Sequence, residues 1–353
     1  LTLSGLDPAK FQTEVNNAQT ALYTLKNKAG MEVCITNFGG RIVSIMVPDK
    51  NGKMQDVVLG FDSIADYINV PSDFGASIGR YANRINQGRF VLDGDTIQLP
   101  QNNFGHCLHG GPKGWQYQVY EANLIDPTTL ELTLISPDGD ANFPGNVTAK
   151  VTYQLTDDNA IDIKYSATTD KKTIINMTNH SYFNLAGEGS GKVLDTYVTI
   201  HAKDYTPVDE FSIPTGEYAS VEGTPMDFNK AKKIGDEIDA DFQQLKFTGG
   251  YDHNYVTDNY AKGSRRVIAS AYNEASGIRM DVISDCPCVQ FYAGNFVIDE
   301  KGKNGHVYNK REGFCLETQV EPNAVNVETF HSPVLEAGEK YQSFTAYKFG
   351  VRK

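Results

Sequence analysis

Residues 147–155 read Val-Thr-Ala-Lys-Val-Thr-Tyr-Gln-Leu, and this stretch decides the class of fold. Apolar side chains occupy every second position from Val147 to Leu155, and polar side chains occupy the positions between them. Because successive side chains of a β-strand point to opposite faces, this alternation predicts a strand with one buried face. The pattern returns at residues 161–165 after a turn at residues 157–159, so the two segments are expected to form a β-hairpin.

The rest of the chain repeats this pattern of short strands and turns. Alternation recurs at residues 31–36, 130–135, 267–272 and 278–283, and turn pairs recur at Asn51-Gly52, Asp93-Gly94, Asp138-Gly139 and Ser276-Gly277. Helical signals are few: Asp7-Pro8 predicts a short helix through Val15, and residues 230–246 carry a weaker helical pattern. No linker or shift in composition divides residues 1–353. We therefore expect a single all-β domain, either an unusually large sandwich or a barrel.

Charge and composition exclude several classes of protein. The chain has 32 Lys and Arg against 44 Asp and Glu, which gives a net charge of −12 and makes nucleic acid or an anionic membrane an unsuitable partner. No run of apolar residues is long enough for a membrane-spanning helix. The five cysteines are too few for a disulfide framework and are expected to be buried apolar residues. The chain begins at Leu1, so trimming and removal of a leader both remain open, as do a cytoplasmic or periplasmic location and a monomer or homodimer.

Two polar segments contain histidine. Residues 105–111, Gly-His-Cys-Leu-His-Gly-Gly, place His109 beside paired glycines, which indicates a loop that bends sharply or approaches another group closely. Residues 176–185, Asn-Met-Thr-Asn-His-Ser-Tyr-Phe-Asn-Leu, hold a dense series of donors and acceptors. Such a cluster is costly to bury unless its members bond to one another or to a polar ligand. A sugar is a suitable ligand, and an internal polar network is the alternative.

A third segment carries a candidate base. In residues 313–320, Gly-Phe-Cys-Leu-Glu-Thr-Gln-Val, alternation puts Phe314 and Leu316 on one face of a strand and Glu317 on the other. If Glu317 is partly buried, its pKa rises, and a carboxylate with a raised pKa can act as a base near neutral pH. The alternative is a solvated glutamate on an outer face of a sheet. Arg84 in residues 79–85 and Asp252 in residues 249–254 offer further groups that can pair with sugar hydroxyls, or with one another at the surface.

Taken together, these motifs resemble those of the aldose 1-epimerases. Residues 176–185 are similar to the family's active-site signature, in which Thr-Asn-His precedes an aromatic pair and Asn-Leu. Further matches lie, in the family's order, at residues 79–85, 108–111, 136–145, 251–253, 289–292 and 316–319. The resemblance runs from about residue 20 to about residue 350 and leaves residues 1–20 as an N-terminal extension.

The resemblance implies a fold, a reaction and a set of site residues. The implied fold is a large antiparallel β-sandwich of the galactose mutarotase type, called a supersandwich, with a few short helices. The implied reaction interconverts the α and β anomers of free aldohexoses such as galactose and glucose, without a cofactor or metal. Glu317 stands at the position of the catalytic base and His180 at that of the catalytic acid. The residues implied to bind the sugar are Asn83, Arg84, His109, Tyr182, Asp252 and Gln290. His106 stands where the family has a small polar residue and receives no role.

Other functions remain as alternatives to this one. A glycoside hydrolase would use two carboxylates, with Glu317 and Asp252 as the pair. A non-catalytic sugar-binding module would bind galactose without turnover. A metal protein is disfavoured because the seven histidines are scattered along the sequence without ligand spacing. A substrate bearing phosphate gains no general attraction from a net charge of −12.

Overall fold

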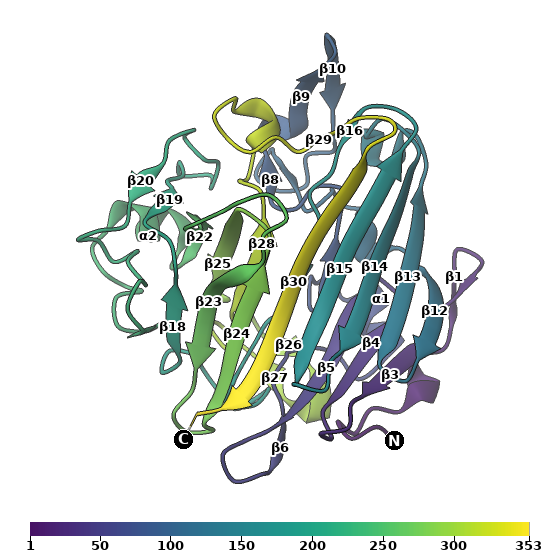
Figure 1. Ribbon diagram of the computed structural model, residues 1–353, viewed down its shortest axis with the longest axis vertical. Coiled ribbons are helices and arrows are strands. Elements are labelled where there is room, and N and C mark those ends of the chain that lie inside the picture. The colour runs from purple at the N-terminus through teal and green to yellow at the C-terminus, as the bar shows by residue number, and fades with distance from the viewer. Residues whose placement is uncertain (353) are drawn as a thin grey trace.

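The fold was analysed in a computed structural model that describes residues 1–352. The longest strands form a nine-stranded antiparallel sheet across the front of the molecule in Figure 1. In spatial order its strands are β12 (Glu121–Asp126), β13 (Thr129–Ser136), β14 (Val147–Leu155), β15 (Ala160–Thr169), β30 (Lys340–Val351), β24 (Ile278–Ser284), β23 (Arg266–Tyr272), β18 (Tyr197–Ile200) and β21 (Lys232–Lys233).

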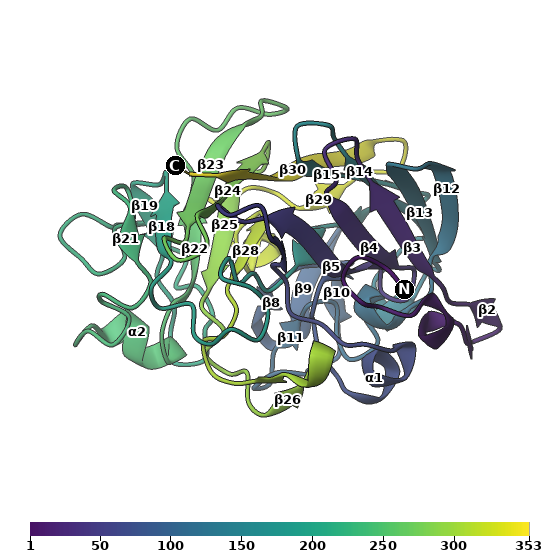
Figure 2. The same cartoon turned by 90° about the horizontal axis from the view of Figure 1, so that it is seen from below.

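Two smaller sheets lie behind this large one, as the view from below in Figure 2 shows. The five-stranded sheet has the order β20 (Ala219–Ser220), β19 (Asp204–Thr206), β22 (Asp252–Val256), β25 (Cys288–Tyr292) and β28 (Cys315–Gln319). The four-stranded sheet has the order β3 (Leu22–Lys26), β4 (Glu32–Thr36), β5 (Arg41–Pro48) and β6 (Met54–Asp56). The chain is therefore an all-β sandwich, and the predicted class of fold is confirmed.

Short ladders and helices fill the connections between these sheets. The two-stranded ladders are β1 (Glu14–Val15) with β2 (Ala18–Gln19), β7 (Ala76–Ile78) with β17 (Thr178–His180), β8 (Arg84–Ile85) with β11 (Cys107–Leu108), β9 (Arg89–Leu92) with β10 (Asp95–Gln98), β16 (Thr173–Ile174) with β29 (Val334–Leu335), and β26 (Glu300–Lys301) with β27 (Val307–Tyr308). The α-helices are α1 (Ile64–Asn69) and α2 (Gln243–Thr248), and single 3₁₀ turns span Pro8–Phe11, Asn86–Gly88, Trp115–Tyr117, Asp140–Asn142, Lys303–Gly305 and Ala324–Asn326.

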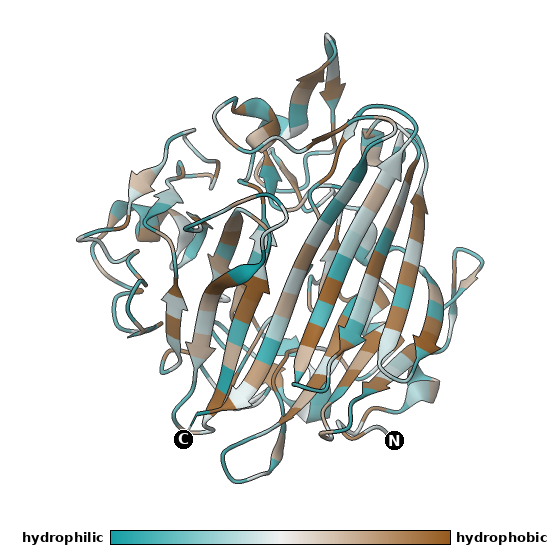
Figure 3. Ribbon diagram, in the orientation of Figure 1, coloured by the Kyte–Doolittle hydropathy of each residue, from teal (hydrophilic) through white to brown (hydrophobic). Residues whose placement is uncertain are grey.

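Alternating side chains build the core between the sheets. Along β14 the residues from Val147 to Leu155 are buried at every second position, as predicted, and Figure 3 shows the matching alternation of hydropathy along the long strands. The hairpin of β14 with β15 also forms, with Leu155 opposite Ile161. The second layer is joined to the first by Tyr347 of β30, whose hydroxyl donates to the carbonyl of Leu316 in β28 at 2.7 Å. All five cysteines are buried and free, as expected for apolar residues.

Both helical predictions extend too far. Asp7 does cap a turn by accepting from the N–H of Ala9, but that 3₁₀ turn ends at Phe11, and Glu14–Val15 form a strand. Within residues 230–246, Lys232–Lys233 pair with β18, and a helix begins only at Gln243. Pairing with neighbouring strands supplies hydrogen bonds that an isolated short helix lacks, so tertiary context overrides the weak local pattern.

The first twenty residues pack against the sandwich. Leu6 and Phe11 are buried, and the N–H groups of Leu3 and Ser4 donate to the carboxylate of Glu32 at 2.9 and 3.2 Å. Within the residues that the structure describes, no helix is long and apolar enough to span a membrane.

Candidate active site

A cavity of about 390 Å³ opens above one face of the five-stranded sheet. Strands β22, β25 and β28 supply part of its wall, and the segment before β7, the β8 and β11 ladder and the end of β17 supply the rest. The cavity is lined by Asp73, Asn83, Arg84, Asn103, Phe104, Leu108, His109, His180, Tyr182, Asp252, Tyr292, Phe296 and Glu317. Of the eight residues that sequence analysis selected, seven line it, and Gln290 does not.

Glu317 reaches the cavity from the middle of β28. Its neighbour Leu316 points the other way, into the apolar core, so the predicted division of faces along this strand is confirmed. The carboxyl group is only 2% exposed, and therefore Glu317 is not the solvated surface residue of the alternative interpretation. Burial raises the pKa of Glu317 well above its ordinary value, and the nearby carboxylates of Asp252 and Asp73 act in the same direction.

His180 approaches Glu317 from a different part of the fold. It is the last residue of β17, which pairs with β7 so that His180 lies opposite Ala76. Its Nε2 lies 3.3 Å from Oε1 of Glu317, and both side chains are almost completely buried. Burial lowers the pKa of the His180 imidazole, and the negative charge of Asp73 opposes this effect. The two groups that sequence analysis assigned to proton transfer are therefore neighbours in one cavity.

Oε1 of Glu317 is a buried hydrogen-bond acceptor that lacks a donor within the described part of the chain. Among the described residues, none donates a hydrogen bond of acceptable geometry to this atom. Buried polar atoms in native proteins are almost always satisfied by protein, water or ligand. An unsatisfied carboxylate oxygen that faces a cavity is therefore suited to accept a proton or hydrogen bond from a bound hydroxyl group.

His109 is fixed as a neutral donor. Its Nδ1 accepts the backbone N–H of Asn83 at 3.0 Å, so in the neutral ring the proton must sit on Nε2. Protonation of Nδ1 would break this bond, and burial lowers the pKa of His109 to about 3. His109 therefore presents an N–H group and has no free lone pair for a proton or a metal. As predicted for this loop, the backbone bends sharply: φ is +50° at His109, and a Cβ at Gly110 would meet the carbonyl of Gly79 at 2.1 Å.

Arg84 and Asp252 place opposite charges on the cavity wall. Nε of Arg84 donates to Oδ1 of Asn103 at 3.1 Å, which fixes the guanidinium against another residue of the cavity wall. Burial raises the pKa of Asp252, while Arg84 and a hydrogen bond from Gln290 oppose this shift. Nε2 of Gln290 donates to Oδ1 of Asp252 at 2.8 Å. Gln290 thus lies behind Asp252 and orients it, rather than facing the cavity itself as expected for a residue that binds a sugar hydroxyl.

Tyr182 completes the set of predicted residues that line the cavity. Its ring packs edge-on against Phe74 with centroids 4.9 Å apart and lies 5.1 Å from the ring of His180. Burial raises the pKa of Tyr182 well above its ordinary value, so the phenol stays neutral and can act only as a hydrogen-bonding group or an apolar surface. Sequence reasoning did not find the remaining lining residues, which are Asp73, Asn103, Phe104, Leu108, Tyr292 and Phe296.

The polar segment 176–185 divides into two parts. Only His180 and Tyr182 line the cavity. Asn176 accepts the N–H of Val320, and Asn179 donates to the carbonyl of Gly75 at 3.1 Å. Most of the segment is therefore an internal network that ties β17 to neighbouring loops, while His180 and Tyr182 are the members that a ligand in the cavity could reach.

Two other basic residues of the motifs are structural. Arg80 is buried and donates to the carbonyls of Ser136, Pro137 and Gly145. It therefore joins two of the motifs that occur together in the sequence. Nδ1 of His106 accepts the N–H of Gln87 at 2.8 Å, which accounts for this histidine as a residue that fixes a loop.

The histidines that are scattered along the sequence are not all scattered in space. The rings of His109 and His180 have centroids 5.0 Å apart. Within the described part of the chain, three groups bring possible metal ligands together, namely Asp73 with His109 and His180, His180 with Cys315 and Glu317, and Cys288 with Glu321 and His331. Because Nε2 of His109 carries a proton, the first group does not offer three free ligand atoms.

Comparison with known proteins identifies the family of this chain and agrees with its fold. A sequence model of the family described as Aldose 1-epimerase matches residues 21–348, so the chain belongs to the aldose 1-epimerase family. It is 41% identical over 324 residues to galactose mutarotase from Bos taurus, covering 91% of this chain and 92% of that protein. It is 39% identical over 331 residues to aldose 1-epimerase from Escherichia coli K12, covering 93% and 94% of the two chains.

Solved structures show the same architecture. An aldose epimerase homologue from C. elegans aligns with a TM-score of 0.85 and 30% identity, over 95% of this chain and all of that one. Galactose 1-epimerase from Lactobacillus acidophilus aligns with a TM-score of 0.84 and 29% identity, over 97% of this chain and 98% of that one. The predicted family is therefore confirmed.

Proposed function

We propose that this protein is an isomerase that interconverts the α and β anomers of free aldohexoses such as galactose and glucose. The observation that carries the proposal is the separation of 3.3 Å between Nε2 of His180 and the unsatisfied Oε1 of Glu317 in a buried cavity. In a cyclic aldose, the ring oxygen and the anomeric hydroxyl are bonded to the same carbon. The imidazole and the carboxylate are therefore close enough to exchange protons with these two oxygens of one bound sugar.

The reaction needs two coupled proton transfers. Glu317 takes the proton of the anomeric hydroxyl while protonated His180 gives a proton to the ring oxygen, so the C1–O5 bond breaks without a free alkoxide or oxonium ion. Rotation about C1–C2 then presents the other face of the aldehyde. Reversal of both transfers closes the ring and yields the opposite anomer, and it returns each proton to its starting group. No net proton or electron is exchanged with solvent.

The remaining residues hold the sugar in place. His109 offers a fixed N–H donor and Arg84 a permanent cation, and both can stabilise negative charge that develops on oxygen during ring opening. Asp252, oriented by Gln290, accepts hydrogen bonds from sugar hydroxyl groups. Asn83 and Tyr182 complete the proposed set of binding residues.

Residues 1–353 are proposed to act as one domain. This proposal is supported by a continuous apolar core that includes residues from all three main sheets and by the burial of Leu6 and Phe11 in the N-terminal extension. Deletion of residues 1–20 is expected to lower the thermal unfolding midpoint, and the remaining chain is expected to unfold in a single transition.

Polarimetry of freshly dissolved α-D-galactose and α-D-glucose tests the proposed function. Added protein is expected to speed the first-order approach to equilibrium rotation in proportion to its concentration, without changing the final rotation. A weakly buffered solution keeps the uncatalysed rate low, and heat-denatured protein is the control. An approach to equilibrium no faster than with denatured protein would contradict the proposal.

The same samples separate the alternatives. A glycoside hydrolase would release new reducing ends from an oligosaccharide, whereas the proposed isomerase releases none. A sugar-binding module would show saturable binding of galactose, measured by calorimetry, with no change in the rate of mutarotation.

A further inference from the structure

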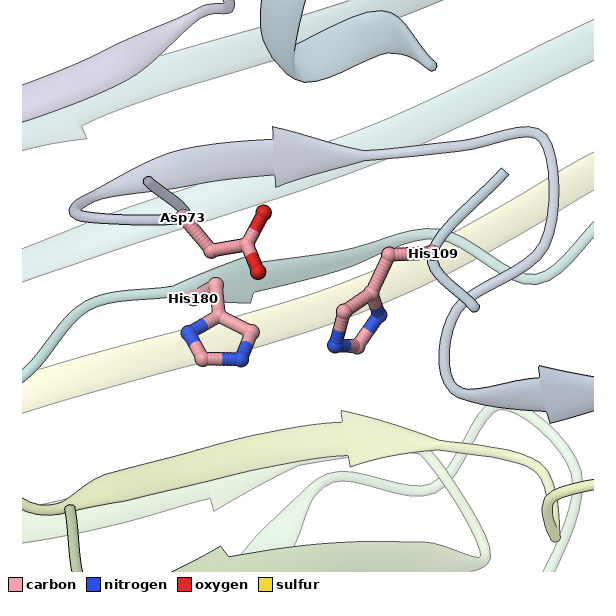
Figure 4. A group of neighbouring side chains, drawn as sticks. All are labelled: Asp73, His109 and His180. Carbon is pink, nitrogen blue, oxygen red and sulfur yellow. The ribbon is translucent and has the colours of Figure 1, made fainter. Parts of the chain in front are cut away.

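Asp73 lines the cavity, and its carboxylate has no role in the two proton transfers described above. Figure 4 shows its carboxylate directed toward the imidazole rings of His109 and His180. One ligand atom from each of these three side chains lies within 4.8 Å of those of the other two. The three residues come from separate parts of the chain, because Asp73 precedes β7, His109 follows β11 and His180 ends β17.

The backbone around Asp73 is held rigidly by a buried arginine. Nη1 of Arg41 donates to the carbonyl of Phe74 at 3.1 Å, and its Nη2 donates to the carbonyl of Ser72 at 2.9 Å. The residues on both sides of Asp73 are thus fixed by one guanidinium group, which is itself inaccessible to solvent. A buried guanidinium is costly unless its N–H groups are bonded, and here the backbone carbonyls on both sides of Asp73 accept from it.

The same segment is tied directly to the two histidines. The N–H of Gly75 donates to the backbone carbonyl of His180 at 3.1 Å. Nε2 of Gln116 lies 3.4 Å from Oδ1 of Asp73 and 3.3 Å from the carbonyl of His109, and it donates to both. The distance between Asp73 and the imidazole of His180 is therefore set by short hydrogen-bonded connections rather than by a flexible loop.

The negative charge of Asp73 is expected to act on His180 rather than on His109. His109 is locked in its neutral form by the N–H of Asn83 and can only donate a hydrogen bond. His180 must carry a proton to serve as the acid, and burial disfavours that charge. The ionised carboxylate of Asp73 offsets this penalty. Burial raises the pKa of Asp73, whereas the positive charges of protonated His180 and of Arg41 and the hydrogen bond from Gln116 lower it.

Several other titratable and charged groups face His180 or act on it. They are Glu317 and Cys315 from β28, Asp252 from β22, Tyr292 from β25, Tyr182 beyond β17, His109 beyond β11, Arg84 from β8 and Arg41 from β5. Glu317 loses its charge when it accepts the substrate proton. Asp252 is engaged by Gln290 and lies near Arg84. Asp73 thus supplies negative charge to His180 throughout the reaction.

We propose that Asp73 is a positioning residue of this reaction, whose negative charge beside the imidazole of His180 favours the protonated ring that gives its proton to the sugar ring oxygen. The inference rests on the proposed isomerase function. Asp73 is then a third ionised group beside the pair of His180 and Glu317. Because Asp73 also repels the negative charge of Glu317, it favours the protonated form of both partners.

The pH profile of Asp73→Asn tests this role. Loss of the negative charge makes protonation of His180 and of Glu317 less favourable, so both limbs of the profile of kcat/KM are expected to move to lower pH by about one unit. At a pH above the basic limb, kcat/KM is then about tenfold below that of the wild type. Asp73→Glu keeps the charge and is expected to restore the wild-type midpoints. Glu210→Gln removes one negative charge from an exposed position and is expected to leave the profile unchanged.

A purely structural role for Asp73 would give a different result. Activity would then fall by the same factor at every pH, or the thermal unfolding midpoint would fall, and the midpoints of the profile would not move. Unchanged midpoints in Asp73→Asn would overturn the proposal.

A second measurement does not depend on turnover. In protein labelled with ¹³C-histidine, the resonance of His180, assigned by its loss in His180→Asn, is expected to titrate at lower pH in Asp73→Asn than in the wild type. An unchanged titration of His180 would also contradict the proposal. Absence of mutarotation in the wild type, together with a shifted titration, would refute the proposed function but leave the electrostatic link between Asp73 and His180 standing.

Discussion

Nε2 of His180 lies 3.3 Å from Oε1 of Glu317, although the two residues stand on strands of different sheets. β17 carries His180 and pairs with β7, whereas β28 carries Glu317 at the edge of the five-stranded sheet. Both side chains are buried, so the surrounding protein rather than water determines how a proton is divided between them. This contact underlies the proposed chemistry.

Removal of the imidazole should abolish most of the acid catalysis. His180→Asn keeps a polar side chain, but its amide does not reach the position of Nε2 and cannot deliver a proton to the ring oxygen. We expect kcat for α-D-galactose to fall by about 10²- to 10⁴-fold, as for the loss of a general acid, while KM changes little. Polarimetry over a range of galactose concentrations measures both constants. Full activity in this variant would exclude His180 as the acid.

The pH dependence of kcat/KM should be narrow. The reaction requires ionised Glu317 and protonated His180. Burial raises the pKa of Glu317 and lowers that of His180, so the acid limb lies above that of an exposed glutamic acid and the basic limb below that of an exposed histidine. Because Glu317 and His180 interact, the two pKa values read from the profile belong to the coupled pair rather than to either residue. A plateau of kcat/KM that begins below the ordinary pKa of glutamic acid and ends above that of histidine would contradict this prediction.

Gln290 should affect binding more than chemistry. Gln290→Met removes the hydrogen bond at 2.8 Å that orients Asp252, but it leaves the contact between His180 and Glu317 in place. A hydrogen bond to a charged group is worth about 1.5 to 3 kcal/mol, so we expect KM to rise by about tenfold or more, with a much smaller change in kcat. An equal loss in both constants, or a large fall in thermal stability, would show that Gln290 supports the fold rather than Asp252.

The buried ion pair of Lys303 with Asp56, outside the cavity, should contribute strongly to the free energy of unfolding. Nζ of Lys303 lies 2.6 Å from Oδ2 of Asp56, with side chains only 1% and 8% exposed. Lys303→Met leaves the carboxylate of Asp56 buried without its partner, and we expect the free energy of unfolding in urea to fall by about 3 to 5 kcal/mol. The double variant Lys303→Met with Asp56→Asn should recover part of this loss. A double variant less stable than the single one would contradict this explanation.

The fold was predictable because its signals are local. Alternation along residues 147–155 identified β14, and the same rule separated Glu317 from the core-facing Leu316 on β28. These are properties of neighbouring residues on one strand, which depend only on the geometry of the extended backbone. The two helical predictions extended too far because part of each segment forms a strand: Glu14–Val15 pair with Ala18–Gln19, and Lys232–Lys233 pair with β18, which is remote in the sequence.

The catalytic candidates were found through motifs, but their surroundings were not. Asp73 stands in an unremarkable Ser-Asp-Phe segment, and it reaches His180 only because Ala76 pairs with His180 across two distant strands. Gln290 likewise sits among motif residues, yet its side chain lies behind Asp252 instead of in the cavity. Such placements depend on long-range pairing and on side-chain packing, which the pattern of a single sequence does not contain.

Polarimetry of Glu317→Gln on freshly dissolved α-D-galactose tests the central claim most directly. The amide matches the carboxylate in size but cannot take a proton from the anomeric hydroxyl. We expect kcat to fall by about 10²- to 10⁴-fold, while calorimetry shows an affinity for galactose within a few-fold of that of the wild type. A rate of mutarotation close to that of the wild type would contradict the assignment of Glu317 as the base, and with it the proposed mechanism.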